Sequence, residues 1–169
     1  YDAKSDFVGL ALVAFTPLYL VVRPDSPYKS LDELVKAAKA APGTLAYGTL
    51  GNGSTAAIAG AMLARSKGME LIDIPYAGYS PALTELLAGR LAFAFVDGSS
   101  LSRIEGGSLR ALAVTTPRRA ARLPQVPTLK ELGANAELAV WFGVYARSGT
   151  PPEAVQRLRD ELKKAIGQP

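Results

Sequence analysis

Apolar positions recur with two different periods along this chain, and the two periods alternate almost from end to end. Short continuous apolar runs are typical of buried strands, whereas apolar residues three and four positions apart are typical of one helix face. Strands are predicted over residues 7–14, 18–22, 71–74, 91–96, 109–114 and 136–145. Because strands that alternate with helices build layered parallel sheets, the pattern predicts an α/β fold. We expect a doubly wound, mostly parallel sheet flanked by helices.

Pairs of polar residues mark where several helices are expected to begin. Ser30 with Glu33, and Thr128 with Glu131, have the spacing of a capping box. Ser80 followed by Pro81 is typical of an N-cap and a first helical residue. The sequence therefore predicts helices after these three positions, and a last helix that opens after residue 150.

Glycine and small hydroxyl residues interrupt the pattern over residues 48–55, before a helix marked by Ile58, Ala61 and Met62. Glycine has no Cβ, so the backbone can turn sharply and approach a ligand closely. The first N–H groups of a helix are unpaired and lie at the positive end of its dipole, which suits a carboxylate or phosphate. A Walker-type loop is excluded because Gly53 is followed by Ser54 and not by lysine, and the Rossmann glycine spacing is absent too. A turn that binds nothing is the alternative.

Two further loops, residues 76–80 and 97–100, also follow predicted strands. Ligands of doubly wound sheets bind outside the carboxyl ends of the strands, so the three loops are expected to meet at one edge. Each candidate side chain also has a purely structural interpretation. Ser54 and Asp97 can cap the helices behind them, and Tyr76 can be a buried aromatic residue.

Composition narrows the chemistry that this chain can perform. Its 169 residues carry a net charge of +4 and include no histidine and no cysteine. Zinc sites of the Cys/His type and catalysis by a Ser-His-Asp or Cys-His arrangement are therefore excluded. Arg118, Arg119 and Arg122 lie in a proline-bounded segment without interleaved aromatic residues, which favours a surface loop over a nucleic-acid site. Two long stretches carry no charge. Residues 7–22 are the more apolar but are broken by proline, and residues 40–64 are longer but rich in polar residues and glycine, so neither is predicted to span a membrane.

Several short motifs follow one another in a fixed order over essentially the whole chain. They are Tyr47-Gly48-x-x-Gly51-Asn52-Gly53-Ser54-Thr55, Ile74-Pro75-Tyr76-Ala77-Gly78-x-x-Pro81-Ala82-Leu83-Thr84-x-Leu86-Leu87-x-Gly89, Leu109-Arg110-Ala111-Leu112-Ala113-Val114-Thr115, Leu123-Pro124-x-Val126-Pro127-Thr128, and Trp141-Phe142-Gly143 followed by Gly149-Thr150-Pro151. In this order they resemble the Bug/TctC family, the periplasmic solute-binding proteins of tripartite tricarboxylate transporters. The resemblance implies one lobe of a type II periplasmic-binding-protein-like fold.

The resemblance also assigns ligand-binding positions. The carboxylate-binding loop would consist of Gly51, Asn52, Gly53, Ser54 and Thr55. Asp97 matches the aspartate of a Phe-Asp-Asn motif, placed to accept a hydrogen bond from a ligand hydroxyl or amino group, and Tyr76 is a further candidate for ligand contact. This chain departs from that motif, because Val96 replaces the aromatic residue and Gly98 the asparagine.

The function that the resemblance implies is that of a periplasmic protein that binds a small organic carboxylate and delivers it to membrane transporter subunits. No catalytic residue, metal, cofactor or nucleic acid is expected. Family members close two lobes around the ligand. Residues 1–169 resemble the second lobe as a single ligand-binding domain, with the first lobe and a C-terminal return segment absent, and residues 7–22 and 141–148 would hold the hinge crossings. Two alternatives remain open: an α/β enzyme that acts on an anionic substrate through Asp97 or Asp73, and a ligand-sensing module for a membrane kinase.

Overall fold

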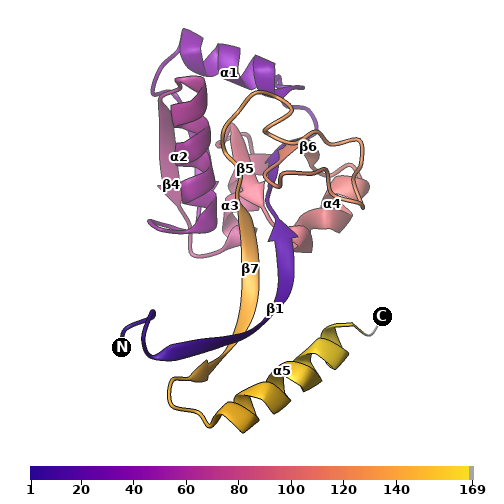
Figure 1. The fold of residues 1–169 in the computed structure, drawn as a ribbon. Helices are drawn as coiled ribbons and strands as arrows, with labels where there is room; N and C mark the ends of the chain where they lie inside the picture. Colours follow the sequence, from indigo (N-terminus) through magenta and orange to yellow (C-terminus); the bar gives the residue numbers. More distant parts are fainter. Residues whose placement is uncertain (168–169) are drawn as a thin grey trace. The chain divides into compact units, whose positions relative to one another are not determined.

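The computed structural model describes residues 1–167 and contains two β-sheets (Figure 1). One sheet has two strands in the order β1-β7, and the other has five in the order β4-β3-β5-β2-β6. The strands are β1 (Phe7–Pro17), β2 (Tyr19–Val22), β3 (Leu45–Thr49), β4 (Leu71–Pro75), β5 (Phe93–Val96), β6 (Arg110–Val114) and β7 (Ala139–Arg147).

The five-stranded sheet is mostly parallel. β3 pairs in parallel with both β4 and β5, whereas β2 pairs antiparallel with β5 and with β6. β3, β4, β5 and β6 therefore share one direction, and β2 alone runs against them. Parallel strands buried on both faces are nearly continuous in apolar residues, which is why these strands were visible in the sequence. The predicted α/β class with a mostly parallel sheet is confirmed.

Helices separate the strands along the chain. They are α1 (Leu31–Ala40), α2 (Thr55–Lys67), α3 (Tyr79–Leu87), the 3₁₀ turn η1 (Gly98–Ser100), α4 (Leu101–Glu105) and α5 (Pro152–Ile166). Among the described residues, no helix is long and apolar enough to cross a membrane.

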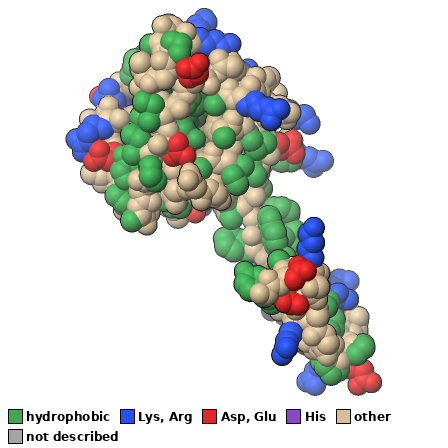
Figure 2. All heavy atoms as spheres, turned by 90° about the vertical axis from the view of Figure 1, so that its left-hand side faces the viewer, with side chains coloured by type: hydrophobic (Ala, Val, Ile, Leu, Met, Phe, Trp, Pro, Cys, Tyr) green, Lys and Arg blue, Asp and Glu red, His purple; other side chains and the backbone are tan. Residues whose placement is uncertain are grey.

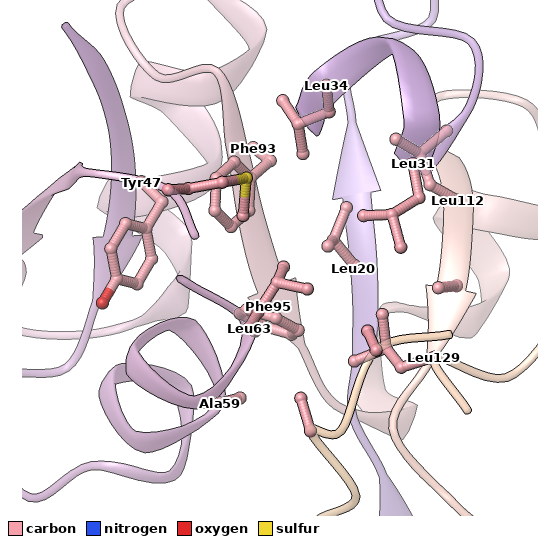
Figure 3. Packing of buried hydrophobic residues seen from close by; sticks show 14 of the residues in the cluster. Leu20, Leu31, Leu34, Tyr47, Ala59, Leu63, Phe93, Phe95, Leu112 and Leu129 are labelled. Carbon is pink, nitrogen blue, oxygen red and sulfur yellow. The ribbon is translucent and has the colours of Figure 1, made fainter. Parts of the chain in front are cut away.

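The core of the five-stranded sheet lies on both of its faces. Successive residues of β2 alternate between two buried clusters: Leu20 and Val22 join the first, and Tyr19 and Val21 join the second. The first cluster also contains the inward side chains of α1 and α2, and the second contains those of α3. Figure 3 shows the first cluster, with side chains from the sheet meeting those of the two helices. Helices cover both faces, as the doubly wound prediction requires.

The helix starts agree with the sequence in part. Ser30 caps α1, because its Oγ accepts a hydrogen bond from the N–H of Glu33 at 3.2 Å. The prediction of Ser80 as N-cap is wrong, since α3 begins at Tyr79 with Gly78 in the cap position. Pro81 is tolerated in the third helical position because the first four N–H groups of a helix need no intrahelical acceptor.

The helix predicted after Thr128 is also wrong. Thr128 and Glu131 do exchange both hydrogen bonds of a capping box, at 2.7 and 3.0 Å. The segment nevertheless forms only turns, and the chain reverses at Gly133, whose φ is +68°. One turn closes, with a hydrogen bond of 3.2 Å from the N–H of Leu132 to the carbonyl of Thr128, but the left-handed conformation of Gly133 stops any further propagation.

The chain divides into two compact units, residues 16–140 and residues 1–15 with 141–169. The larger unit contains the five-stranded sheet with α1 to α4. The smaller unit contains most of β1 and β7 together with α5. None of the residues of α5 is buried, although the helix has a distinct apolar face, and Figure 2 shows hydrophobic side chains exposed on this unit. Leu158, for example, is 44% exposed.

Candidate functional site

Three loops leave the same edge of the five-stranded sheet. β3 lies between β4 and β5, and both neighbours run parallel to it. Thr49 at the end of β3 is paired with Pro75 at the end of β4, and Gly48 is paired with Ala94 near the end of β5. The loops that follow these strands therefore begin at one level, at the carboxyl edge of the sheet. This is where doubly wound folds bind their ligands.

The loop after β3 is shaped by two glycines. Gly51 and Gly53 have φ angles of +92° and +80°, a conformation that side chains with a Cβ rarely adopt. A Cβ built at either position would meet no atom within 4 Å, so the requirement is one of backbone conformation and not of space. The turn closes with a hydrogen bond of 3.1 Å from the N–H of Ser54 to the carbonyl of Gly51.

The hydroxyl of Ser54 is the N-cap of α2. Its Oγ accepts hydrogen bonds from the N–H of Leu50 at 3.3 Å and from the N–H of Ala57 at 3.2 Å. Both lone pairs of this oxygen are therefore engaged within the loop. The capping interpretation accounts for Ser54, whereas direct contact with a ligand stays a prediction for it and for the other members of the loop.

Four N–H groups at the start of α2 are left without an acceptor. Within residues 1–167, the backbone N–H groups of Asn52, Gly53, Thr55 and Ala56 make no hydrogen bond. The first turn of α2 also carries no acidic residue, unlike that of α1, which holds Asp32 and Glu33. Unpaired N–H groups and the positive end of the helix dipole make this helix start a donor array for an anion.

The position of α2 is fixed by a close approach to β3. A Cβ built on Gly60 would lie 2.1 Å from Cε2 of Tyr47, so only glycine permits this packing. The Tyr47 ring is stacked on Phe93 with centroids 5.1 Å apart, and its hydroxyl donates to the carbonyl of Ala57 at 3.5 Å. Burial raises the pKa of Tyr47 to about 12, and the charge of Asp73 acts in the same direction. This neutral tyrosine therefore holds the first two turns of α2 against the sheet.

A second buried hydroxyl, which the sequence did not single out, holds the start of the loop. Thr49 is 1% exposed and donates from its Oγ1 to Oδ1 of Asp73 at 2.6 Å. The same Oγ1 accepts a hydrogen bond from the N–H of Gly51 at 3.2 Å. The only sequence signal was the alternation that places Thr49 on a buried strand. Thr49 and Asp73 thus fix the direction in which the loop leaves β3.

Asp97 follows β5 and is partly occupied by its own turn. Its Oδ1 accepts hydrogen bonds from the N–H and the hydroxyl of Ser99, at 2.9 and 2.6 Å, and caps η1. Its Oδ2 has no partner among the described residues. The next N–H, that of Gly98, donates to Oγ1 of Thr16 at 3.3 Å. One oxygen of Asp97 is therefore structural, and the other remains able to accept a hydrogen bond.

Tyr79, which the sequence reasoning missed, lies close enough to Asp97 for its titration to respond to it. Burial raises the pKa of the Tyr79 hydroxyl, and the charge of Asp97 raises it further. Tyr79 is therefore a neutral hydrogen-bond donor at physiological pH. Its position as the first residue after Gly78 was the available signal, since side chains at a helix start face the loop edge.

Tyr76 faces different charges. Its backbone N–H donates to the carbonyl of Thr49 at 2.9 Å, and its ring packs against the second hydrophobic cluster. Burial raises the pKa of the Tyr76 hydroxyl, and the charge of Glu85 raises it further, whereas the charge of Arg90 lowers it. Different charges therefore act on the two hydroxyls, those of Glu85 and Arg90 on Tyr76 and that of Asp97 on Tyr79. Ligand contact by Tyr76 stays a prediction.

The whole chain, residues 1–169, matches the family model described as tripartite tricarboxylate transporter family receptor, or TctC. A Cupriavidus necator protein encoded in the gbd 5′ region is 40% identical over 169 residues, which is 100% of this chain and 52% of that protein. The chain spans about half the length of the curated relatives that it matches.

The fold of this chain is also similar to that of solved structures. The R. palustris protein Rpa4515 with adipate has a TM-score of 0.87 and 34% identity, over 99% of this chain and 57% of that one. MatC from Rhodopseudomonas palustris with bound malate has a TM-score of 0.83 and 26% identity, over 99% of this chain and 58% of that one.

Proposed function

This chain belongs to the TctC family of tripartite tricarboxylate transporter receptors, and we propose that it binds a small organic carboxylate at the start of α2 for delivery to the membrane subunits of such a transporter. The family is one of receptors and not of enzymes, so the alternative of an α/β enzyme is set aside. Binding would make and break no covalent bond.

The observation that carries the proposal is the donor array of Asn52, Gly53, Thr55 and Ala56. These N–H groups have no acceptor in the described part of the chain, and the first turn of α2 carries no acidic residue. An exposed helix start stabilises an anion by about 0.3–1 kcal/mol, and a partly buried one by up to about 2 kcal/mol. Hydrogen bonds to a charged group add about 1.5–3 kcal/mol each when water is excluded. Together these terms are sufficient to orient a carboxylate.

A second group on the ligand would be recognised by Asp97 and Tyr79. The free Oδ2 of Asp97 can accept a hydrogen bond from a ligand hydroxyl, and the neutral Tyr79 can donate one to a second carboxylate. The relatives with adipate and with malate support a dicarboxylate as the substrate class. Gly51 and Ser54 would shape the loop, since their backbone N–H groups already have acceptors.

We further propose that residues 1–169 act as one lobe of a two-lobed receptor that works in the periplasm. The half-length match to curated relatives supports this, because a second portion of similar size remains in each of them. The apolar face of α5, with Leu158 and Ile166 exposed in the smaller unit, would then pack against that second portion. A receptor that hands a solute to a membrane transporter must also operate on the side from which the solute arrives.

A single lobe supplies only part of the ligand contacts, so its affinity is expected to be weak. We expect a Kd for adipate in the millimolar range, or about 4 kcal/mol of binding free energy. The test is an NMR titration of the 169-residue chain with adipate, in which the backbone amide signals of residues 52–56 are followed. A sub-micromolar Kd, or shifts that leave these amides unaffected, would contradict the proposal.

Thr55→Pro provides the sharpest variant for this test. Thr55 is the first helical residue, where proline is favoured, and its N–H has no acceptor. The preceding Ser54 has φ −67° and ψ 151°, the extended conformation that a following proline requires. The substitution removes one donor and preserves the helix, so we expect adipate binding to fall at least tenfold without loss of stability.

Thr55→Val is the matched control. It removes the hydroxyl and keeps the N–H, so its adipate Kd should stay within about twofold of that of the original chain if backbone donors bind the ligand. Equal losses in the valine and proline variants would assign the interaction to the hydroxyl and would refute the donor-array mechanism.

A further inference from the structure

A pocket in the larger unit lies at the edge of the five-stranded sheet opposite to the loops of the candidate site. It has a volume of about 350 Å³ and is lined by the first residues of β6, the end of α4 and the segment around Val126. Because β6 runs in the direction of β3, β4 and β5, its first residue, Arg110, lies at the amino edge of the sheet. The pocket is therefore separate from the loops at the carboxyl edge.

The pocket contains an arginine whose charge is not compensated. Arg110 lines its wall, and the Nη1 atom of Arg110 is buried with no hydrogen-bond partner in the described part of the chain. Nor does any ion pair within residues 1–167 include this side chain. The Arg110 side chain is otherwise partly exposed, so the unsatisfied group is one nitrogen of a cationic guanidinium that carries five N–H donors. An unpaired buried donor of this kind requires an explanation.

The carboxylates near the pocket are already engaged elsewhere. Glu105, which follows the lining residue Ile104, accepts a hydrogen bond from Nη2 of Arg122 at 2.8 Å. Asp25, which follows the lining residue Pro24, accepts one from Nη1 of Arg23 at 2.8 Å. Each of these acids thus has an arginine of its own. Neither acid is paired with Arg110.

The remaining walls define what kind of anion would fit. Ile104, Leu109 and Val126 contribute apolar surface, and the only other polar side chain of the lining is that of Gln125. One cation and one amide match a single carboxylate group, and the apolar surface matches a short hydrocarbon body. We propose that this pocket is a second anion site, which binds a small monocarboxylate with its charged end on Arg110 and its apolar part along Ile104 and Val126.

The experiment uses hexanoate as the probe and the 169-residue chain as the protein. In an NMR titration the backbone amides of Gly107 and Ala111 and the side-chain Nε–H of Arg110 are expected to shift and to saturate in the millimolar range. Arg110→Gln should weaken the response at least tenfold. The matched control is Arg103→Gln, which removes the same charge from an exposed position of α4 and should leave the response unchanged.

Two further measurements keep the proposal testable if Arg110→Gln does not fold. Gln125→Glu places a carboxylate beside Arg110 at an exposed turn position, so it should reduce hexanoate binding at least tenfold in a folded protein. Hexanamide has the same apolar body without the charge and should bind at least tenfold more weakly than hexanoate. Equal binding of the acid and the amide, a response confined to residues 52–56, or no saturable shift at Gly107 and Ala111 would each overturn the proposal.

Discussion

Gly60 is the position at which α2 and β3 approach most closely, so Gly60→Ala directly perturbs the packing that positions the donor array. The new Cβ would lie 2.1 Å from Cε2 and 2.3 Å from Cζ of Tyr47. Carbon atoms in favourable contact are about 3.5–4.0 Å apart, so the helix or the ring must move by more than about 1 Å. Tyr47 is 4% exposed and stacked on Phe93 at an interplanar angle of 3°, which leaves the ring no space to yield.

Two effects of opposite sign decide the outcome. Replacing glycine by alanine inside a helix is favourable by about 0.8–1 kcal/mol. Overpacking a well-packed core costs about 1–3 kcal/mol, and the severity of this contact places Gly60→Ala at the upper end. We therefore expect the free energy of unfolding to fall by about 2 kcal/mol. Because the displaced element is α2 itself, adipate binding should weaken in the same variant.

The assay is urea unfolding monitored by circular dichroism, with Ala61→Gly as the control. Ala61 is exposed in the same helix, so its substitution measures the helix-propensity contribution without a packing change. In a Tyr47→Leu background, where the ring is absent, Gly60→Ala should cost much less than in the original chain. If Gly60→Ala instead raised the stability by the amount that Ala61→Gly loses, the steric reasoning would be refuted.

Three further predictions concern the Thr49 hydroxyl, the buried Tyr47 and the apolar face of α5. Thr49→Val removes the hydroxyl that accepts a hydrogen bond from the N–H of Gly51 and donates one to Asp73. We expect the free energy of unfolding, measured in urea, to fall by about 1–3 kcal/mol. A fall below about 0.5 kcal/mol would mean that the hydroxyl does not hold the loop. Burial raises the pKa of Tyr47 to about 12, against an ordinary value near 10. Between about pH 10 and 12 the tyrosine is therefore deprotonated in the unfolded chain and still protonated in the folded one, so the free energy of unfolding falls as the pH rises. Tyr47→Phe should remove that part of the decline in urea unfolding at pH 9 to 12, and an unchanged decline would contradict it. Leu158→Glu should reduce self-association of the 169-residue chain in sedimentation velocity, because Leu158 is 44% exposed on the apolar face of α5, and equal association of both proteins would rule that face out.

The strands were predictable because burial on two faces leaves a direct trace in the sequence. Leu20 and Val22 point to one cluster and Tyr19 and Val21 to the other, so the whole strand is apolar whichever face is considered. The N-cap at Ser30 was predictable for a related reason, since it needs only residues three positions apart, although Glu33 accepts its hydrogen bond from the N–H of Lys29 and not from that of Ser30. Signals of this kind are local and survive in any tertiary context.

The buried face of α2 was not predictable in the same way. Ile58 is 43% exposed, while Ala56, Ala59 and Gly60 face the core together with a single large residue, Leu63. Helix faces are normally identified by their largest apolar residues, but here the small residues are inward because the Tyr47 ring occupies the space between helix and sheet. That space is a property of two elements together, and neither segment shows it alone.

The roles within the candidate site illustrate the same division. Glycine spacing located the loop, and the capping preference of serine located the helix start, because both are requirements of the local backbone. The oxygen atoms of the Ser54 and Thr49 hydroxyls, however, already accept hydrogen bonds from N–H groups of the loop, whereas several other backbone N–H groups there have no acceptor among the described residues. Backbone donors recognise negative charge and do not distinguish one carboxylate from another. We therefore expect side chains on the neighbouring loops to discriminate among carboxylates, and Asp97 and Tyr79 are the candidates, since the charge of Asp97 acts on the Tyr79 hydroxyl only through the fold.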